Sequence, residues 1–289
     1  MDEKVYIILL NYKGYEDTME CIKSLESITY KNYKIVIVDN NSPDDSYSKI
    51  SKELKKDHIL IKAEDNGGFA KGNNIGIKYA LNNGADYILL INNDTLVEKN
   101  LIEELLKPFK REKNLGLTTG KIYYEGKRDT LWFAGGTFNE KRFYGMHLGE
   151  GEKDIGKYDK DKEITFSTGC LMMIKREVFE EIGYLPEEYF MYYEDVDYCL
   201  KLRQAGYRLW FNPKAVIYHK VSASTGGEAS PFALKLNTRN RIVLMKKHKK
   251  NLMFFYATRI IVIIRYAVKG ETQRCKGVIE GIKEGIKVK

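Results

Sequence analysis

The chain has 289 residues, of which 43% are hydrophobic, so it can bury one large core or two modest ones. Its 48 lysines and arginines outnumber its 40 acidic residues and give a net charge of +8, but the two signs are mixed through most of the chain. This dispersed charge argues against a nucleic-acid-binding module. The 4 cysteines lie far apart without a C-x-x-C pair, so neither a zinc site nor a disulfide framework is indicated, and a reducing cytoplasm is expected.

Up to about residue 95, short apolar runs alternate with longer segments of helical spacing. The runs cover residues 5–10, 34–38, 59–62 and 87–91, and the segments between them, 15–28, 44–56 and 70–83, are long enough for helices. This alternation predicts an α/β fold with a Rossmann-like, mostly parallel sheet flanked by helices. Ligands of such sheets bind beyond the carboxyl ends of the strands, so we expect the four loops that follow the strands to converge.

Polar residues follow each predicted strand. Asn11 follows the first, Asp39 the second, and Asn66 with Gly67 the third, and Asn73 lies in the segment after that. The glycine loop joins a strand to a helix, where backbone N–H groups can face a phosphate or a ribose. It has neither the P-loop nor the dinucleotide fingerprint, and a turn with helix capping by Asn66 explains it equally well.

The fourth apolar run is followed by Asn92, Asn93 and Asp94. A divalent cation that bridges two phosphates needs only one or two protein carboxylates, because phosphate and water supply the other oxygens. Asp94 is therefore a candidate metal ligand. The alternative is a helix N-cap, since Asp94 also precedes a helical stretch at residues 98–107.

The second half of the chain has a mixed pattern. Strand-like pieces are expected at residues 116–124, 131–137 and 164–167, with a surface loop at 149–162 and a strand pair at 207–211 and 215–219. We expect one unit at residues 1–245, made of a nucleotide-binding half (1–95) and an acceptor half (96–245). A basic, apolar, helical tail at residues 246–289 completes the chain.

Three carboxylates, Glu194, Asp195 and Asp197, stand among aromatic residues at a predicted helix start. Acids this close repel one another and raise each other's pKa, so their retention beside apolar surface indicates a base or an anion. The alternative is a first helical turn whose acidic residues complement the macrodipole.

The ordered series of motifs resembles the family 2 glycosyltransferases of the GT-A fold, and within them the rhamnosyltransferase-like and galactofuranosyltransferase-like branch. The resemblance covers about residues 4–245. Its motifs are Asn-Tyr after the first strand, Val-Asp-Asn-Asn-Ser after the second, Asn-Gly-Gly-Phe-Ala-Lys-Gly-Asn-Asn after the third and Asn-Asn-Asp after the fourth, then Thr-Gly-Cys, Glu-Asp-Val-Asp and His219.

The resemblance implies roles for individual residues. Asp39 accepts from the base of the nucleotide, Asn66 and its loop lie against the nucleoside, and Asn93 lies near the ribose. The donor-binding residues expected on this basis are Asn11, Asp39, Asn66, Gly67, Asn73, Asn93 and Arg239, and the ligands of a Mg²⁺ or Mn²⁺ ion are Asp94 and His219. A hydrogen-bonded structural histidine and a solvated arginine are the alternatives for His219 and Arg239.

The implied activity is an inverting transfer of a sugar from a dTDP- or UDP-sugar to a hydroxyl of a glycan or a lipid-linked acceptor. Asp195 is the expected general base, and Glu194 orients the acceptor or tunes Asp195. The chain departs from the family's Asp-x-Asp motif because Asn92 replaces the first carboxylate, and an amide contributes less charge to a hard cation. A non-catalytic carbohydrate- or nucleotide-binding protein of the same fold is therefore the alternative.

Aromatic residues suggest further surfaces. Trp132, Phe133, Phe138 and Tyr144 suit either stacking on sugar rings or a place in the core. Residues 246–268 combine a lysine cluster with apolar residues, which suits docking on an anionic membrane, packing on the domain or a homodimer interface. This stretch is too short and too charged to span a bilayer, and the N-terminus has no signal-peptide pattern, so a cytoplasmic protein, peripheral on the membrane if the tail docks, is expected.

Overall fold

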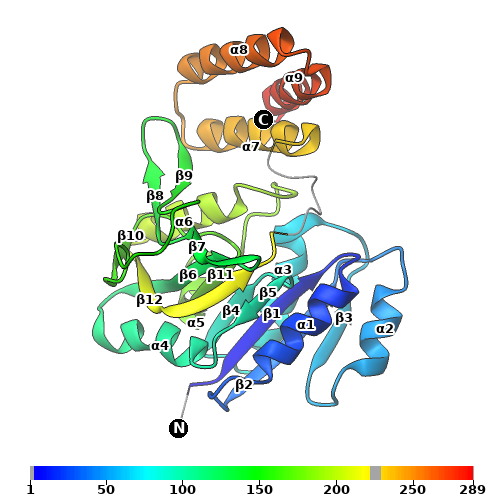
Figure 1. The fold of residues 1–289 in the computed structure, drawn as a ribbon, viewed down its shortest axis with the longest axis vertical. Coiled ribbons are helices and arrows are strands. Elements are labelled where there is room, and N and C mark those ends of the chain that lie inside the picture. The colour runs from blue at the N-terminus through cyan, green and yellow to red at the C-terminus, as the bar shows by residue number, and fades with distance from the viewer. Residues whose placement is uncertain (1–2, 222–228, 289) are drawn as a thin grey trace.

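A computed structural model describes residues 3–221 and 229–288. The molecule consists of an α/β body with a layer of helices stacked on it (Figure 1). Within the described residues the main sheet has 10 strands, with β10-β12-β6-β11-β4-β1-β2-β3 as its central order. The predicted α/β architecture, with a parallel first half and a mixed second half, is confirmed.

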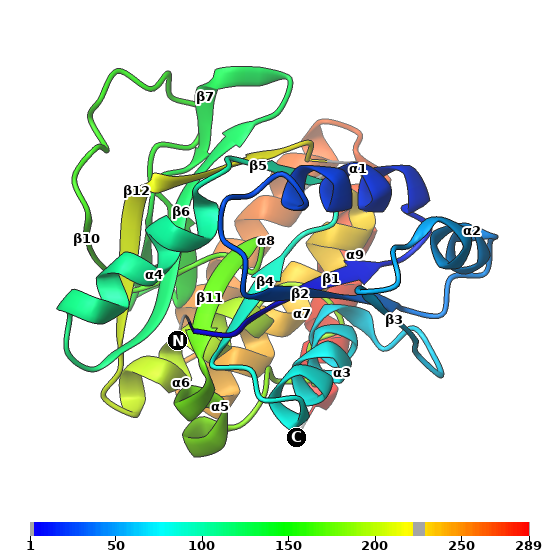
Figure 2. The same ribbon diagram turned by 90° about the horizontal axis from the view of Figure 1, so that it is seen from below.

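The parallel half of the sheet forms from the predicted apolar runs. Its elements are β1 (Val5–Asn11), α1 (Tyr15–Leu25), β2 (Tyr33–Asp39), α2 (Ser46–Glu53), β3 (Ile59–Lys62), α3 (Gly68–Asn82) and β4 (Tyr87–Ile91). Seen from below, α1 and α2 lie on one face of these strands and α3 on the other (Figure 2). Strands covered on both faces read as continuous apolar runs, which is why their positions were predictable.

The second half is mixed, as expected, but it differs from the prediction in three places, the first being the strand expected at 164–167, which instead ends at Ile164. Its elements are β5 (Thr95–Val97), α4 (Leu101–Arg111), β6 (Leu115–Tyr124), β7 (Lys127–Phe133), β8 (Gly136–Asn139), β9 (Tyr144–His147), β10 (Lys162–Ile164), β11 (Leu171–Lys175), α5 (Arg176–Ile182), α6 (Glu194–Gln204) and β12 (Arg208–His219). The predicted pair after residue 207 is wrong, because both runs belong to β12, whose register against β6 shifts between Asn212 and Val216. Pro213 lies in this irregularity, where its missing N–H breaks the ladder without ending the strand.

The strand predicted at 131–137 is split between β7 and β8. Gly135, with φ of +95°, turns the chain between them. Trp132, Phe133 and Phe138 are at most 9% exposed, so these three rings belong to the core and the stacking alternative is wrong for them. Tyr144 is only half-buried, and the Arg241 guanidinium lies 4.9 Å from its ring centroid.

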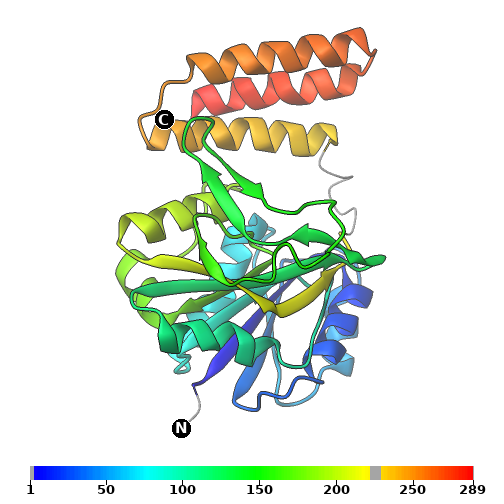
Figure 3. The same cartoon turned by 60° about the vertical axis from the view of Figure 1, so that its left-hand side comes forward.

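The helical layer contains α7 (Pro231–Lys247), α8 (Met253–Val268) and α9 (Thr272–Lys287). In Figure 3 they are stacked outward from the body in the order α7, α9, α8. Glycines let α9 approach α7 closely: a Cβ on Gly277 would lie 2.4 Å from the Pro231 carbonyl oxygen, and one on Gly281 would lie 2.4 Å from that of Lys235. Helix α7 runs continuously through residues 245 and 246, where the sequence suggested a boundary.

No helix in residues 3–221 or 229–288 is both long enough and apolar enough to cross a membrane.

Candidate active site

The loops after β1 and β2 are joined at the carboxyl edge of the sheet. Asn11 and Asp39 are paired in the register of the two strands, and Asn11 Nδ2 donates to Asp39 Oδ2 at 2.6 Å. Ser42 donates to the same carboxylate from its backbone N at 2.9 Å and from its Oγ at 2.8 Å. Both Asn11 and Asp39 are fully buried. In this structure Asp39 therefore holds the two loops together through three donors.

Thr18, which the sequence analysis did not single out, extends this network to the loop after β4. Its Oγ1 donates to Asn11 Oδ1 at 2.9 Å and accepts from Asn93 Nδ2 at 2.8 Å. The loop after β3 joins as well, because Asn40 Nδ2 donates to Asn66 Oδ1 at 2.8 Å. The predicted convergence of four loops on one edge is thus confirmed.

The glycine loop serves the local structure at the start of α3. Asn66 Oδ1 accepts from the Gly68 N–H at 3.2 Å, which closes the expected turn, but the N-cap of α3 is Gly67, so capping by Asn66 is wrong. Asn73 Nδ2 donates to the Phe69 carbonyl at 2.9 Å. Gly68 has φ of +83°, and a Cβ there would lie 1.9 Å from the Phe190 carbonyl oxygen. Only glycine fits this crossing, which brings α3 against the segment that leads into α6.

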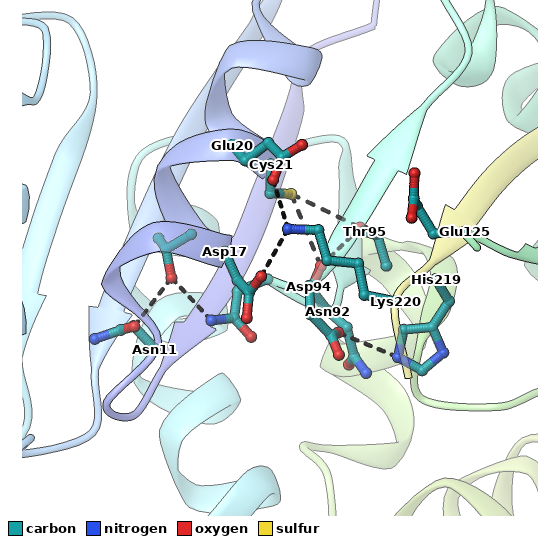
Figure 4. A network of polar contacts seen from close by, with 12 residues as sticks. Asn11, Asp17, Glu20, Cys21, Asn92, Asp94, Thr95, Glu125, His219 and Lys220 are labelled. Carbon is teal, nitrogen blue, oxygen red and sulfur yellow. Dashed lines mark hydrogen bonds and ion pairs between the residues drawn. The ribbon is translucent and has the colours of Figure 1, made fainter. Parts of the chain in front are cut away.

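Asp94 and His219 meet because β5 pairs antiparallel with the end of β12, with His219 opposite Thr95. His219 Nε2 lies 3.1 Å from Asp94 Oδ1, and both side chains are largely buried (Figure 4). Burial opposes a charge on His219, but the neighbouring Cys170 thiol and the Asp94 carboxylate together raise its pKa to about 10. The N-cap alternative for Asp94 is wrong, because α4 begins only at Leu101.

The pair can supply two ligands to a cation. Among the residues that the structure describes, no group of three or more His, Cys, Asp and Glu side chains is arranged to hold a metal ion. Two ligands suffice when a diphosphate and water complete the shell. His219 Nδ1 is buried without a hydrogen-bond partner, and the ring packs edge-on against Trp132 with 4.7 Å between the centroids. The donor set of Asp94 and His219 therefore fits a divalent cation that arrives with a diphosphate.

The end of β12 is also fastened to α1, by a contact that the sequence analysis missed. Lys220 Nζ lies 2.7 Å from Asp17 Oδ1 and also bonds Glu20 (Figure 4). The spacing of Asp17 and Glu20 places both on one face of α1. Nothing in that spacing indicates a partner some two hundred residues away in the chain.

The segment before α6 has an unusual backbone. Tyr192 and Tyr193 have φ of +69° and +75°, a region that residues with a side chain rarely adopt. Asn240 of α7 holds this segment, because its Nδ2 donates to the Met191 and Tyr192 carbonyls at 2.8 and 2.9 Å. Strain of this kind persists where surrounding contacts over-determine the backbone. Here the contacts with Asn240 fix the backbone before α6 and so the direction in which the carboxylates of its first turn point.

Asp195 is the carboxylate of this turn that stays partly exposed. Its Oδ2 accepts from the Gly169 N–H at 3.0 Å and its Oδ1 from the Val196 N–H at 2.7 Å. Burial raises the pKa of Asp195, and these hydrogen bonds oppose the rise. Cys170, which follows Gly169 in the chain, accepts a hydrogen bond of 3.2 Å at its carbonyl oxygen from the Asn92 N–H. Two consecutive residues therefore connect Asp195 to the strand end that carries Asp94.

Glu194 and Asp197 have different surroundings. Glu194 is 5% exposed, and its Oε2 has no hydrogen-bond partner. Burial, and then the charge of Asp195, raise its pKa well above the ordinary range. Asp197 is ion-paired with Lys247 at 2.7 Å and lies 3.4 Å from His248, which ties α6 to α7. All three acids nevertheless lie in the first turn of α6, where the macrodipole alternative placed them.

Replacing Glu194 by glutamine is expected to change how stability depends on pH. In the wild type the folded protein retains the Glu194 proton above the unfolded pKa of about 4.5, so stability falls as pH rises towards the folded pKa. Glutamine cannot ionise, so the Glu194→Gln protein gains on the wild type by up to about 1.4 kcal/mol per pH unit in this window. Denaturant unfolding from acidic to alkaline pH measures the difference. Parallel curves for the two proteins would contradict the raised pKa, and Glu64→Gln, at an exposed glutamate, is the control.

Arg239 lies on α7 beside the same segment. Its Nη1 donates to the Glu188 carbonyl at 3.2 Å and to Asn240 Oδ1 at 2.5 Å. Arg239 therefore helps to hold α7 against the body, and these hydrogen bonds do not direct it to Asp94 or His219. The structure therefore brings Asn11, Asp39, Asn93 and the metal pair into one edge, and places Arg239 in the adjoining helical layer.

The α/β sheet and the helices that flank it have the GT-A fold of glycosyltransferases. Residues 5–183 match the model of the family described as Glycosyl transferase family 2, and the chain belongs to this family. The expected family and fold are thereby confirmed, and with them the expectation of an enzyme.

Two curated relatives cover most of this chain. The low-salt glycan biosynthesis hexosyltransferase Agl10 of Haloferax volcanii is 29% identical over 245 residues, which are 84% of this chain and 76% of Agl10. The dTDP-rhamnosyl transferase RfbF of Shigella flexneri is 23% identical over 293 aligned positions, covering 99% of this chain and 94% of RfbF. The alignment with RfbF thus includes the helical layer.

Two solved structures share the fold. One is the mannosyltransferase PcManGT of Pyrobaculum calidifontis in complex with GDP-Man and Mn²⁺, with a TM-score of 0.61, 15% identity and coverage of 87% of this chain. The other is GalNAc-T7 with UDP, GalNAc and Mn²⁺, with a TM-score of 0.62, 17% identity and coverage of 85%. This chain spans 65% of the first solved chain and 50% of the second.

Proposed function

We propose that the protein is an inverting glycosyltransferase that moves a sugar from a nucleotide-diphosphate sugar to a hydroxyl of a glycan or lipid-linked acceptor. The observation that carries the proposal is the link through Gly169 and Cys170, which places the partly exposed Asp195 beside the strand end of Asp94. A base and a candidate diphosphate site then lie on one sheet edge. The alignment with a dTDP-rhamnosyl transferase along nearly the whole chain favours a dTDP-sugar donor, with UDP-sugars as the alternative.

On the donor side, Asp94 and His219 would hold Mg²⁺ or Mn²⁺ against the diphosphate. When bound, the cation supplies Lewis-acid stabilisation of the leaving group. His219 must lose its proton to act as a ligand, and its raised pKa makes that loss costly, so metal affinity should rise with pH. The two solved structures that share the fold were determined with Mn²⁺, which supports a divalent cation here.

On the acceptor side, Asp195 would remove the proton of the attacking hydroxyl. Its raised pKa makes it a stronger base than an exposed aspartate. The raised pKa of Glu194 favours its neutral form, which would limit the negative charge beside Asp195 and fits the proposed tuning role. With the base and the leaving diphosphate on opposite faces of the anomeric carbon, a single displacement inverts the configuration.

Nucleotide diphosphates are expected to stabilise the protein in a metal-dependent manner. A ligand at 100 times its Kd adds about 2.7 kcal/mol to the free energy of unfolding. We expect dTDP or UDP to raise the melting temperature by several degrees with Mn²⁺ or Mg²⁺, and much less in EDTA, in a thermal shift measurement that includes GDP and CDP. No shift with any nucleotide would contradict the donor site.

Because Asn92 stands where the family motif has a carboxylate, a non-catalytic protein of the same fold is the alternative, and the same experiment tests it. A metal-dependent shift without any release of nucleotide diphosphate from dTDP- or UDP-sugars, with or without acceptor glycans, would favour a binding protein of the same fold. Transfer or slow hydrolysis of the donor would support the enzyme. A nucleic-acid-binding module is disfavoured further by charge, since residues 1–245 together carry −1.

A further inference from the structure

Helix α8 exposes a continuous apolar stripe to solvent. Its members are Met253, Phe254, Ile260, Ile261, Ile264 and Val268, which are between 56% and 83% exposed. At 3.6 residues per turn they share an arc of roughly 120° on one side of the helix. Of the 16 residues in α8, Phe255 is the one that is fully buried. A stripe this long on an ordinary surface would be costly to leave in water.

The two arginines of α8 do not interrupt this stripe. Arg259 points to the inner side, where its guanidinium lies 5.2 Å from the ring centroid of the buried Phe255 and its Nε is buried. Arg265 is exposed, and helical spacing places it at the rim of the stripe together with the exposed Lys269. In the sequence the two arginines interrupt the apolar run. In the folded helix they lie outside the stripe, so the stripe carries no charge and has a basic border.

Positive charge is concentrated in the same part of the chain. Residues 246–289 hold 12 lysines and arginines against 3 acidic residues, a net charge of +9 in a protein whose total is +8. Lys249 and Lys250 are exposed just before α8, and Lys269 just after it. Lysines and arginines near an anionic membrane surface each strengthen binding to it.

We propose that α8 docks in the plane of an anionic membrane, with its apolar stripe in the boundary between headgroups and acyl chains and its basic border on the headgroups. A second copy of the chain is the other candidate occupant. A twofold interface would bring two segments of net charge +9 together, and like charges that face each other across an interface repel. An anionic lipid surface complements both the apolar stripe and its basic border.

This orientation has a consequence for the acceptor, which rests on the proposed transferase function. Helix α7 joins the helical layer to the active site, because Asn240 holds the segment before Glu194 and Lys247 pairs with Asp197. Figures 1 and 3 place the layer over the body, with α8 on the outside. A docked α8 would therefore hold the site at a fixed height above the membrane, where an acceptor carried by a membrane lipid can reach it.

Sedimentation with vesicles tests the docking without any sugar transfer. We expect the full chain to bind vesicles of phosphatidylcholine with phosphatidylglycerol, to bind those of phosphatidylcholine alone more weakly, and to lose affinity in high salt. The double variant Ile260→Glu with Ile264→Glu should bind roughly 100-fold more weakly, because each isoleucine side chain moved out of water is worth a factor of ten or more. The matched control is Ile155→Glu, at an isoleucine that is 85% exposed in a loop of the body.

A second variant, Lys249→Glu with Lys269→Glu, tests the basic border separately and leaves the stripe intact. It should lose the preference for anionic vesicles. The proposal would be overturned if the wild-type protein did not bind vesicles. It would also be overturned if the stripe variant bound them as tightly as the wild type. Light scattering that found a dimer for the wild type and a monomer for the stripe variant would overturn it as well. Because the vesicles carry no acceptor, failure here leaves the proposed transferase function standing, and loss of transfer by a vesicle-bound protein would count against that function alone.

Discussion

Asp195→Asn is expected to lower the turnover number by ~10²–10⁴-fold, the usual contribution of a general base. Asparagine keeps the size of the side chain and can still accept the bond from the Gly169 N–H, but it cannot take a proton from the acceptor hydroxyl. Metal-dependent binding of the nucleotide should be unchanged. Steady-state transfer rates and a nucleotide titration of the same protein measure the two quantities. Because the pKa of Asp195 is raised, the acidic limb of the wild-type rate profile should lie above pH 3.8.

Asp197→Asn is the matched control, from the same turn of α6. Its carboxylate is 3% exposed and paired with Lys247, so its loss should lower the free energy of unfolding and leave the chemical step intact. Because Lys247 is 43% exposed and keeps its pair with Glu188, the loss should be ~1 kcal/mol. Wild-type transfer by Asp195→Asn would exclude the base role. Equal losses of transfer in two folded variants would show that the whole turn, rather than Asp195, is required.

Asp94→Ala and His219→Ala are expected to abolish most of the metal-dependent binding of nucleotide diphosphate and to lower turnover by roughly 10²–10³-fold. Both residues would serve one cation, whose stabilisation of the leaving group is worth several kcal/mol. The two side chains lie 3.1 Å apart, so their effects should not add. The double variant should be little worse than either single one. Calorimetric titration of dTDP or UDP with Mn²⁺ measures the loss.

Asp17→Asn is the control for this pair, since it removes a nearby carboxylate that bonds Lys220 on the other side of the β12 end. It should keep metal-dependent nucleotide binding. Unchanged nucleotide affinity in Asp94→Ala would contradict the metal role and leave Asp94 as the structural partner of His219. Affinity lost equally with and without metal would point to a damaged edge of the sheet instead.

The sequence was a good guide wherever the decisive interactions are local or follow a simple period. The four apolar runs became β1 to β4 within a residue or two of their predicted ends. Parallel strands covered on both faces must be apolar throughout, and this rule also located the loops beyond their carboxyl ends. The convergence of Asn11, Asp39 and Asn93 on one edge follows from that topology.

Predictions failed where a contact distant in the chain decides. Residues 207–211 and 215–219 read as two strands because Pro213 breaks the local pattern, yet pairing with β6 and β5 keeps them in one. The N-cap alternative for Asp94 failed for a similar reason, since pairing with β12 turns the next residues into β5. Neither pairing leaves a signal within a short window of sequence.

By itself, the sequence determined the order of strands and helices as far as β4, the family and most of the polar residues at the sheet edge. Only the tertiary structure decided what each of them faces. It separated three adjacent acids into the partly exposed Asp195, the buried Glu194 and the ion-paired Asp197, because their surroundings come from Gly169 and α7. It also turned Arg259 inward and left an uncharged stripe on α8. Burial, and with it pKa and exposure, depends on which distant elements pack together, and local sequence does not encode that.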